Sequence, residues 1–233
     1  MPSYQSIVVL TGAGISAESG IRTFRASDGL WENHPVEEVA TPEGYYRNPA
    51  LVQSFYNGRR QQLSEVTCNG AHKALSDFEK TFDGSFLLVT QNVDDLHSRA
   101  GSQNLIHMHG ELYKARCQDT DEVFDWYEDI TTQTLCPCCH KAGNLRPHIV
   151  WFGEMPLEMD RIYEALSACD LFVSIGTSGN VYPAAGFFAE AKAAGADTVE
   201  LNLEPGSNAS QFDQSLTGLA TERVPGFFNA LLG

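Results

Sequence analysis

The sequence of 233 residues lacks any uninterrupted apolar stretch near the ~18 residues that a membrane-spanning helix requires. Its first residues include no basic segment, and the apolar run at 7–10 is too short for the core of a secretory signal. Internal repeats and low-complexity segments are also missing. These absences argue against a membrane or secreted protein, so we expect a cytoplasmic one.

Basic residues are scarce, with 15 Lys and Arg against 30 Asp and Glu, and the net charge is −15. A face that binds nucleic acid needs clustered basic side chains to neutralise phosphates, and an anionic membrane attracts the same residues. We therefore expect no direct contact with nucleic acid or membrane, and we predict a monomer. The excess negative charge favours basic partners at long range.

Only six cysteines are present, and in a cytoplasmic protein they are expected to be reduced thiols or metal ligands, not a disulfide framework. Hydrophobic residues make up 42% and charged residues 19%, which is typical of a folded globular chain. A domain of this size buries roughly 70% of its unfolded surface, enough for a core without covalent staples. We expect one domain, 1–233, that contains insertions.

Short apolar runs alternate with helical patterns along most of the chain. Runs rich in Val, Ile and Leu are typical of strands buried on both faces of a parallel sheet, and they occur at 6–10, Ser85–Thr90, Leu171–Ile175 and 198–203. Helical patterns lie at 71–80, 157–168 and 183–194. The alternation predicts an α/β fold with a Rossmann-like parallel sheet.

Two stretches interrupt this alternation. Residues 31–67 read as a helical insertion, and residues 112–148 hold four of the six cysteines with little periodicity. We predict that they form a smaller lobe, with the large lobe built from 1–30, 68–111 and 149–233. Ligands of open α/β sheets bind at the carboxyl ends of the strands, so the cleft between the lobes is the expected site.

The first predicted strand leads into G-x-G-x-x-A, with Gly12, Gly14 and Ala17 at the defining positions. Glycines allow a tight turn and close approach to a pyrophosphate, and the helix that follows offers free N–H groups. No Lys follows, which excludes a Walker-type loop. Alone, the motif could also be a simple strand-to-helix turn.

Polar residues cluster at the end of the second predicted strand. Amides and a carboxylate at 91–94 suit hydrogen bonding to a ribose and a carboxamide, but Asn and Asp are also preferred helix caps. His107 and His109 follow; if they lie on a strand, both imidazoles face the same side. An imidazole is the natural general base at neutral pH.

A cysteine module and an arginine pair complete the candidates. Cys136-Pro-Cys-Cys139 contains Cys-x-x-Cys, a zinc-type pattern when a second pair is present. In the helical insertion, Tyr56 and Arg59 are three positions apart and share a helix face. Arg60, at four positions, could share that face too, so spacing does not choose between the arginines.

Several of these segments resemble the sirtuin family, in the family's order, from about residue 7 to 220. They are TGAGISAESGIRTFR at 11–25, TQNVDDLHSRAG at 90–101, His-Gly at 109–110 and LRPHIVWFGE at 145–154. The chain departs from the family at Arg22 and Thr23, where Pro and Asp are usual. The resemblance implies a Rossmann-like lobe, a zinc-type module and NAD as a consumed co-substrate.

The resemblance also implies site residues. NAD would be bound by Gly12, Ala13, Gly14, Ala17, Phe24, Arg25, Gln91, Asn92, Val93, Asp94, Gly176, Thr177, Ser178, Asn202, Leu203, Glu204 and Ala220. The implied catalytic residues are His109, Asn92 and Asp94. Backbone from Val150, Phe152, Gly153 and Glu154 would pair with an extended substrate peptide.

The family's zinc ligands match Cys117, Cys136 and Cys139, while Thr120 stands where a fourth cysteine is usual. Cys138, His140 or Asp119 could complete the tetrahedral set, or the module could be metal-free. Tyr-x-x-Arg resembles the mark of the class III sirtuins, which implies that Tyr56 and Arg59 bind a dicarboxylic acyl group. A guanidinium binds a carboxylate through two hydrogen bonds, and a phenol adds a third donor.

The function implied is removal of acetyl, and preferentially succinyl or malonyl, groups from protein lysines. By the family's mechanism, the acyl oxygen attacks the ribose carbon that bears nicotinamide. His109 then deprotonates a ribose hydroxyl, and the products are lysine, nicotinamide and 2′-O-acyl-ADP-ribose. A mono-ADP-ribosyltransferase that uses the same NAD site is the alternative, and a module that only binds acyl-lysine or NAD is a third hypothesis.

Overall fold

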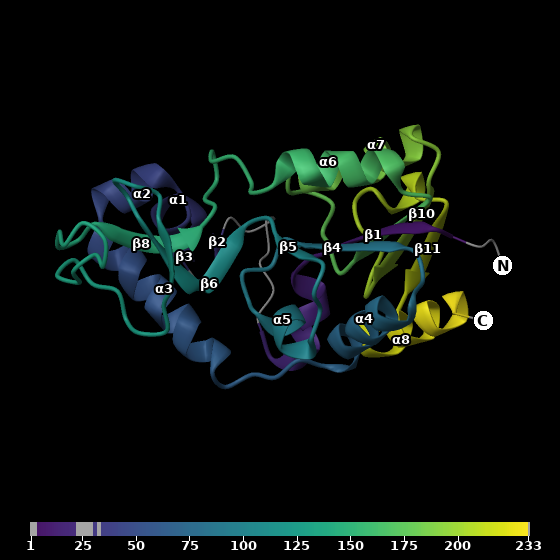
Figure 1. Ribbon diagram of the computed structural model, residues 1–233, viewed down its shortest axis with the longest axis horizontal. Helices are drawn as coiled ribbons and strands as arrows, with labels where there is room; N and C mark the ends of the chain where they lie inside the picture. The colour runs from purple at the N-terminus through teal and green to yellow at the C-terminus, as the bar shows by residue number, and fades with distance from the viewer. Residues whose placement is uncertain (1–3, 22–29, 32–33, 233) are drawn as a thin grey trace.

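The computed structural model describes residues 4–21, 30–31 and 34–232. A six-stranded sheet forms the centre of the large lobe (Figure 1). Its order is β11-β10-β9-β1-β4-β5, and every neighbouring pair is parallel. In that order the strands are β11 (Gln214–Thr217), β10 (Asp197–Asn202), β9 (Leu171–Ile175), β1 (Ser6–Thr11), β4 (Ser85–Thr90) and β5 (Leu105–His107). The α/β fold predicted from the sequence is confirmed.

Helices cover both faces of this sheet, because alternate strand residues point to opposite faces. Ile7 and Val9 face α4 (Gly70–Thr81) and α8 (Ala220–Leu231). Val8 and Leu10 face the other layer, α6 (Met159–Ala168) and α7 (Phe187–Ala193). Figure 1 shows these layers above and below the sheet. Short helices connect the remaining segments: η1 (Ala13–Ser19), α5 (Leu96–Ala100), η3 (Ala184–Gly186) and η4 (Ala209–Gln211).

The smaller lobe lies beyond the β5 side of the sheet (Figure 1). Its antiparallel sheet has the order β7-β6-β8, formed by β7 (Val123–Asp125), β6 (Gly110–Cys117) and β8 (Leu145–Ile149). Its helical part contains α1 (Val36–Val39), α2 (Pro42–Arg47) and α3 (Pro49–Leu63), preceded by the short pair β2 (Leu30–Trp31) and β3 (His34–Pro35). Within the described chain, no helix is both long and apolar enough to cross a membrane.

The position of α3 in this lobe depends on how the helix begins and on which of its side chains are buried. Asn48 accepts a hydrogen bond from Leu51 N at 3.1 Å, and Pro49 follows as the first helical residue, both favoured at a helix start. Val52 and Tyr56, four residues apart, are fully buried. The helix therefore presents one face to the core of the smaller lobe.

Candidate active site

The turn after β1 lies against the turn after β9. Gly12 N donates to Ile175 O at 3.0 Å, and Gly14 N donates to Gly176 O at 2.9 Å. A Cβ on Gly12 would lie 2.8 Å from Gly176 O, and one on Gly14 would lie 2.6 Å from Gly176 Cα. Only glycine tolerates this close approach. Backbone without side chains therefore lies at the point where the strand order of the sheet reverses, which is the expected ligand position in such sheets.

A cavity of about 690 Å³ opens at this point and extends between the two lobes. All the cofactor residues predicted from the sequence and lying in the described chain line it: Gly12, Ala13, Gly14, Ala17, Gln91, Asn92, Val93, Asp94, Gly176, Thr177, Ser178, Asn202, Leu203, Glu204 and Ala220. His109 and Arg59 line it as well, with Val150, Phe152, Gly153 and Glu154. Phe24 and Arg25 lie outside the described residues.

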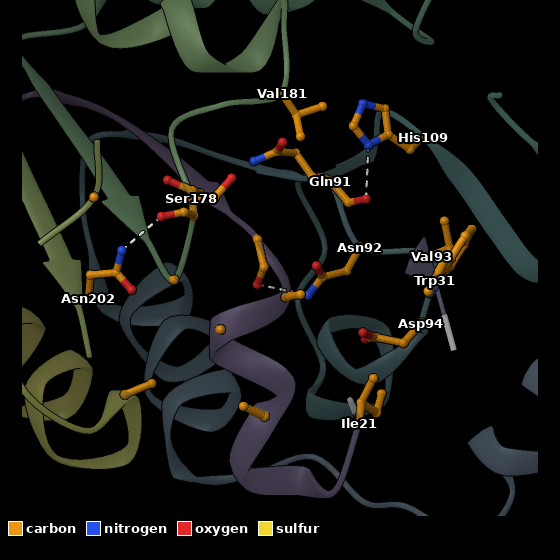
Figure 2. Close-up of a pocket in the computed structure, with 18 of the residues that line it drawn as sticks. Ile21, Trp31, Gln91, Asn92, Val93, Asp94, His109, Ser178, Val181 and Asn202 are labelled. Carbon is orange, nitrogen blue, oxygen red and sulfur yellow. Dashed lines mark hydrogen bonds between the residues drawn. The ribbon is translucent and has the colours of Figure 1, made fainter. Parts of the chain in front are cut away.

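Asn92 is held rigidly at the floor of the cavity. Its amide nitrogen Nδ2 donates to Gly12 O at 3.1 Å (Figure 2) and to Ser16 Oγ at 3.2 Å. Its backbone N donates to Thr90 Oγ1 at 3.1 Å. Because both amide hydrogens are directed to protein, the carbonyl oxygen of the side chain is the atom left to address a ligand.

Asp94 serves a local structural role and faces the cavity at the same time. One carboxylate oxygen accepts from Leu96 N at 3.1 Å at the start of α5, and the other accepts from Ser16 Oγ at 3.0 Å. The residue is only 4% exposed, and this burial raises the pKa of its carboxyl group. One conformation of the Asp94 side chain therefore both bonds the start of α5 and faces the cavity.

His109 is oriented by a backbone carbonyl. Its Nδ1 lies 3.0 Å from Gln91 O (Figure 2), and because a carbonyl only accepts, Nδ1 carries the proton and Nε2 holds the free electron pair. Burial lowers the pKa of the imidazole below its ordinary value, so it is neutral at pH 7. The geometry suits a general base.

His107 has a different environment. β5 ends at His107, so His109 does not lie on that strand and the condition for a shared strand face is not met. The chain turns between β5 and β6, which begins at Gly110 with a φ of 81°, a conformation that favours glycine. His107 Nε2 instead lies 3.7 Å from a carboxylate oxygen of Glu111.

Two buried histidines lie behind the cavity floor and were not singled out from the sequence. His72 Nε2 lies 3.3 Å from Ser16 Oγ, and His97 Nε2 lies 3.0 Å from Thr11 Oγ1. Their ring centroids are 4.8 Å apart. Burial lowers the pKa of His72 to about 4 and that of His97 well below its ordinary value, so both are neutral supports of the site.

The arginine pair on α3 divides into two environments. Arg59 lines the cavity; its Nη1 donates to Gln62 Oε1 at 2.7 Å and its guanidinium lies over the Trp31 ring, 5.6 Å from the centroid. Arg60 points away, with Nε donating to Leu112 O at 2.9 Å and Nη1 to Asn57 Oδ1 at 2.8 Å. Helical spacing left open which of the two arginines faces the site, and in the structure Arg59 is the one that lines the cavity.

Tyr56 is fully buried behind the cavity wall and is not among the described residues that line the cavity. Its Oη accepts from Trp151 Nε1 at 2.9 Å. Burial raises the pKa of the phenol, which therefore keeps its proton at neutral pH.

The loop after β8 is closed by an ionic cluster. Arg146 binds the Glu154 carboxylate through both terminal nitrogens, at 2.7 and 3.0 Å, and Arg116 adds a bond of 3.1 Å. Trp151 N donates to the same carboxylate at 2.8 Å. The loop is also fixed at Phe152, whose N donates to Ala40 O at 2.9 Å. Four donors on one carboxylate hold the loop's backbone in place.

The cysteine module brings four thiols together. The Sγ atoms of Cys117, Cys136, Cys138 and Cys139 all lie within 4.8 Å of one another. Asn144 Nδ2 approaches the Sγ atoms of Cys117 and Cys139, at 3.3 and 3.1 Å, as an outer donor to the cluster. Four converging sulfurs are the donor set of a structural zinc site, so the residues fit that metal, and Cys138 is the thiol that joins the three expected ones.

The other candidates for a fourth ligand, His140 and Asp119, do not belong to the group of converging thiols. Asp119 pairs with Lys141 at 2.5 Å, and Thr120 Oγ1 lies 3.5 Å from Cys138 Sγ. Cys138 therefore lies near the side chain that occupies the usual fourth-cysteine position.

Several cavity-lining residues were missed from the sequence: Glu18, Ile21, Trp31, Leu112, Trp151 and Arg223. Trp151 could have been found, because it lies inside the segment already assigned to the substrate. Arg223 carries no local pattern that distinguishes it from a surface arginine; it lines the cavity because α8 returns to the sheet edge.

Comparison with known proteins agrees with this architecture. The family model described as "Sir2 family" matches residues 12–183. A protein of Pasteurella multocida named NAD-dependent protein deacylase is 64% identical over 228 residues, covering 97% of each chain. One of the same name from Escherichia coli is 60% identical over 228 residues, covering 97% of this chain and 82% of its own.

Solved structures give the same result. The NAD complex of a Sir2 homologue has a TM-score of 0.89 at 37% identity, with 99% of this chain and 91% of that chain covered. A Sir2 structure bound to acetylated peptide has a TM-score of 0.83 at 26% identity, with 97% and 93% covered. The family match spans most of the sequence and includes the glycine turn and His109, and so this chain belongs to the Sir2 family.

Proposed function

We propose that this chain is an NAD-dependent protein-lysine deacylase that prefers succinyl and malonyl groups and also removes acetyl groups. The observation that carries the proposal is the position of His109. A neutral imidazole with a free Nε2 lines the same cavity as the glycine turn at one end and Arg59 at the other. Relatives at 60–64% identity bear the name NAD-dependent protein deacylase.

NAD would lie with its pyrophosphate at the glycine turn. Gly12 and Gly14 line the cavity at this turn with backbone and no side chain, so a phosphate could approach them closely. The adenosine end would lie toward β10, where Asn202 is fixed by donating to Thr177 O at 2.8 Å (Figure 2). The nicotinamide end would lie toward Gln91, Asn92 and Asp94.

Each polar residue of the floor has a task in this chemistry. The bond between the ribose carbon and nicotinamide breaks as the acyl oxygen bonds to that carbon. Asp94 would hold the carboxamide, and Asn92 would orient the ribose through its side-chain oxygen. His109 Nε2 would then accept a proton from a ribose hydroxyl so that the oxygen can attack the acyl carbon. Water adds to the resulting intermediate and the bond from the acyl carbon to the lysine nitrogen breaks. NAD and one water are consumed, and nicotinamide, free lysine and 2′-O-acyl-ADP-ribose are released.

The acyl preference rests on Arg59. A cationic side chain that is 7% exposed and lines the cavity favours a ligand that brings a negative charge. A succinyl or malonyl carboxylate supplies that charge in a geometry that a guanidinium binds with two hydrogen bonds. An acetyl group offers the guanidinium no carboxylate to bind, so we expect acetyl turnover at lower efficiency.

The peptide that carries the lysine would pair with the loop 150–154, whose backbone is fixed by Glu154 and Phe152. We further propose that zinc is bound by Cys117, Cys136, Cys138 and Cys139, where it would join the β6 end to the loop before β8. Its part is structural, because all four positions are taken by protein. Action as a monomer, in the cytoplasm and without nucleic acid, stays a prediction.

The test is release of nicotinamide from NAD with peptides of one sequence that carry acetyl-lysine or succinyl-lysine. We expect release with both and a higher kcat/KM with succinyl. Release with acetyl alone would keep the deacylase and reject the role of Arg59. Labelled ADP-ribose attached covalently to protein, in place of soluble acyl-ADP-ribose, would favour the mono-ADP-ribosyltransferase.

A further inference from the structure

Arg223, near the start of α8, lines the cavity beside the carboxyl ends of β10 and β11. Gly218 N donates to Asn202 O at 2.9 Å, which holds the ends of these two strands together. Arg223 N donates to Leu219 O at 2.9 Å, and its Nε donates to Thr217 O at 2.6 Å. These bonds fix both the backbone and the side chain of the arginine against the strand ends.

The stem of the Arg223 side chain lies against the backbone of Gly218. A Cβ at Gly218 would lie 2.6 Å from Arg223 Nε and 3.1 Å from its Cγ, so a side chain at this position would push the stem away. The φ of 145° at Gly218 is itself a conformation that favours glycine. Among the described residues, none accepts a hydrogen bond from the two terminal nitrogens, so the flat guanidinium is available to a ligand.

Two exposed leucines line the same end of the cavity. Leu203 follows β10 and is 64% exposed, and Leu219 follows β11 and is 42% exposed. When a ligand covers such side chains, their apolar surface leaves water, and this favours binding. Apolar side chains beside a planar cation suit an aromatic ring, because a guanidinium stacks on the faces of such rings.

Acidic residues near this end argue against a further phosphate as the ligand of Arg223. Glu18 lines the cavity and accepts from Thr221 N at 3.0 Å at the start of α8, and Glu204 lines the cavity just beyond β10. An additional anion beside Arg223 would be repelled by these carboxylates. A neutral flat ring is the better fit, and adenine is that ring in the cofactor proposed above.

We propose that Arg223 is a cofactor-specificity residue that binds the adenine base of NAD through the flat face of its guanidinium. The two leucines would cover the base, and the bond from Nε to Thr217 O would hold the guanidinium in place. The inference rests on the proposed NAD site and deepens it, because Arg223 lies outside the sequence motifs that imply the other cofactor residues.

The test is Arg223→Met, which keeps an apolar stem beside Gly218 and removes the guanidinium. The dissociation constant for NAD, measured by isothermal titration calorimetry without acyl peptide, should rise roughly 3- to 20-fold, the range of a cation on an aromatic ring. In steady-state kinetics the loss should appear in the KM for NAD and not in the KM for an acyl peptide.

Arg161→Met is the matched control. Arg161 pairs with Glu158 on α6 at 3.0 Å and is not among the described residues that line the cavity. This variant should bind NAD as tightly as the unmodified protein does. Arg223 is exposed, so its substitution should leave the fold intact; if Arg223→Met does not fold, Arg223→Gln is measured with the same expected result.

A smaller base tests the stacking itself. Nicotinamide cytosine dinucleotide carries one ring in place of the two of the purine, so Arg223→Met should raise its dissociation constant by a smaller factor than that for NAD. An equal factor for both dinucleotides would overturn the inference, because the arginine would then act on the sugars or the phosphates. A larger factor for NADP than for NAD would also overturn it, because the guanidinium would then belong to a 2′-phosphate.

Binding by the unmodified protein separates this inference from the function on which it rests. If the unmodified protein binds neither NAD nor ADP-ribose, the proposed function itself fails. If it binds NAD and releases nicotinamide, and Arg223→Met leaves the dissociation constant for NAD unchanged, only the role of Arg223 fails.

Discussion

Arg146 and Trp151 stack face to face, with the guanidinium carbon 3.3 Å from the ring centroid. Both belong to the segment that resembles the family's LRP and FGE motifs, and Glu154 at the end of that segment closes it into one unit. Arg146 therefore supports the wall of the cavity, while its charge is paired with the Glu154 carboxylate. The relationship suggests how the peptide loop and the acyl end are held together.

Arg146→Lys tests this support. Lysine keeps the charge but loses the planar stack and one of the two hydrogen bonds to Glu154, so we expect the free energy of unfolding to fall by about 2 kcal/mol. The KM for an acyl peptide should rise several-fold with little change in the KM for NAD. Urea unfolding and steady-state kinetics measure both.

Arg116→Lys is the matched control, because Arg116 binds the same Glu154 carboxylate at 3.1 Å from a more exposed position. This substitution should lower the free energy of unfolding by less than about 1 kcal/mol. Equal effects of the two substitutions would show that the ion pair matters and the stack does not.

Arg59→Met should lower desuccinylation far more than deacetylation, by about 10- to 100-fold in the ratio of kcat/KM, the range of a charged hydrogen-bonded pair. The matched variant is Arg60→Met on the next residue of α3. Because Arg60 holds Leu112 O and Asn57, it should lower stability without changing that ratio. A ratio that moves equally in both variants would contradict the assignment of Arg59 as the acyl residue.

Much of this site follows from local patterns in the sequence. The strand predicted at Ser85–Thr90 and the helix predicted at 71–80 agree with β4 and α4, because apolar periodicity there matches burial. Gly12 and Asn92 could be assigned because each lies in a short motif at a strand end. Local pattern is sufficient where one segment makes both the fold and the site.

Other features depend on contacts between distant segments, which no local pattern encodes. β11 was missed because it is a short, mostly exposed edge strand, and α8 was missed because Pro225 lies inside it. The choice of Arg59 over Arg60 depends on where Leu112 lies, and Tyr56 lies behind the cavity because Trp151 covers it. Helical spacing gives the face of a residue but not the partner that occupies it.

His109→Ala should abolish acyl transfer, with a fall in kcat of at least about 100-fold, while NAD still binds. In the unmodified enzyme, burial lowers the pKa of His109 below its ordinary value of 6.5. The base is therefore already deprotonated at neutral pH, and the acid limb of the pH–rate profile should lie below pH 6.5. An acid limb centred above pH 7 would contradict this role, as would a variant with full activity.

Cys138→Ser should release the metal if this thiol completes the zinc site. Zinc content should fall toward zero, and Tm should fall by about 5 °C or more, because metal binding contributes to folding. Cys68→Ser is the control, since Cys68 is a free thiol outside the cluster. One equivalent of zinc retained in Cys138→Ser would point to His140 or Asp119 as the fourth ligand.

The buried histidines should make the protein sensitive to acid. His97 is fully buried and its pKa is lowered well below 6.5, so below pH 6.5 the unfolded chain binds a proton that the folded chain does not. Stability from this group is complete above pH 6.5 and is lost as the pH falls. His72, whose pKa is lowered to about 4, adds a loss in the window from 6.5 to 4.

His97→Gln keeps a group that can bond Thr11 and removes the titration. Between pH 7 and pH 5 the free energy of unfolding should therefore fall by about 2 kcal/mol less in the variant than in the unmodified protein. Both proteins keep the four clustered cysteines, so any loss of metal at low pH cancels in the difference. Urea unfolding at the two pH values measures it. Parallel losses would mean that His97 stays protonated or accessible in the fold, and the acid sensitivity would then belong to other groups.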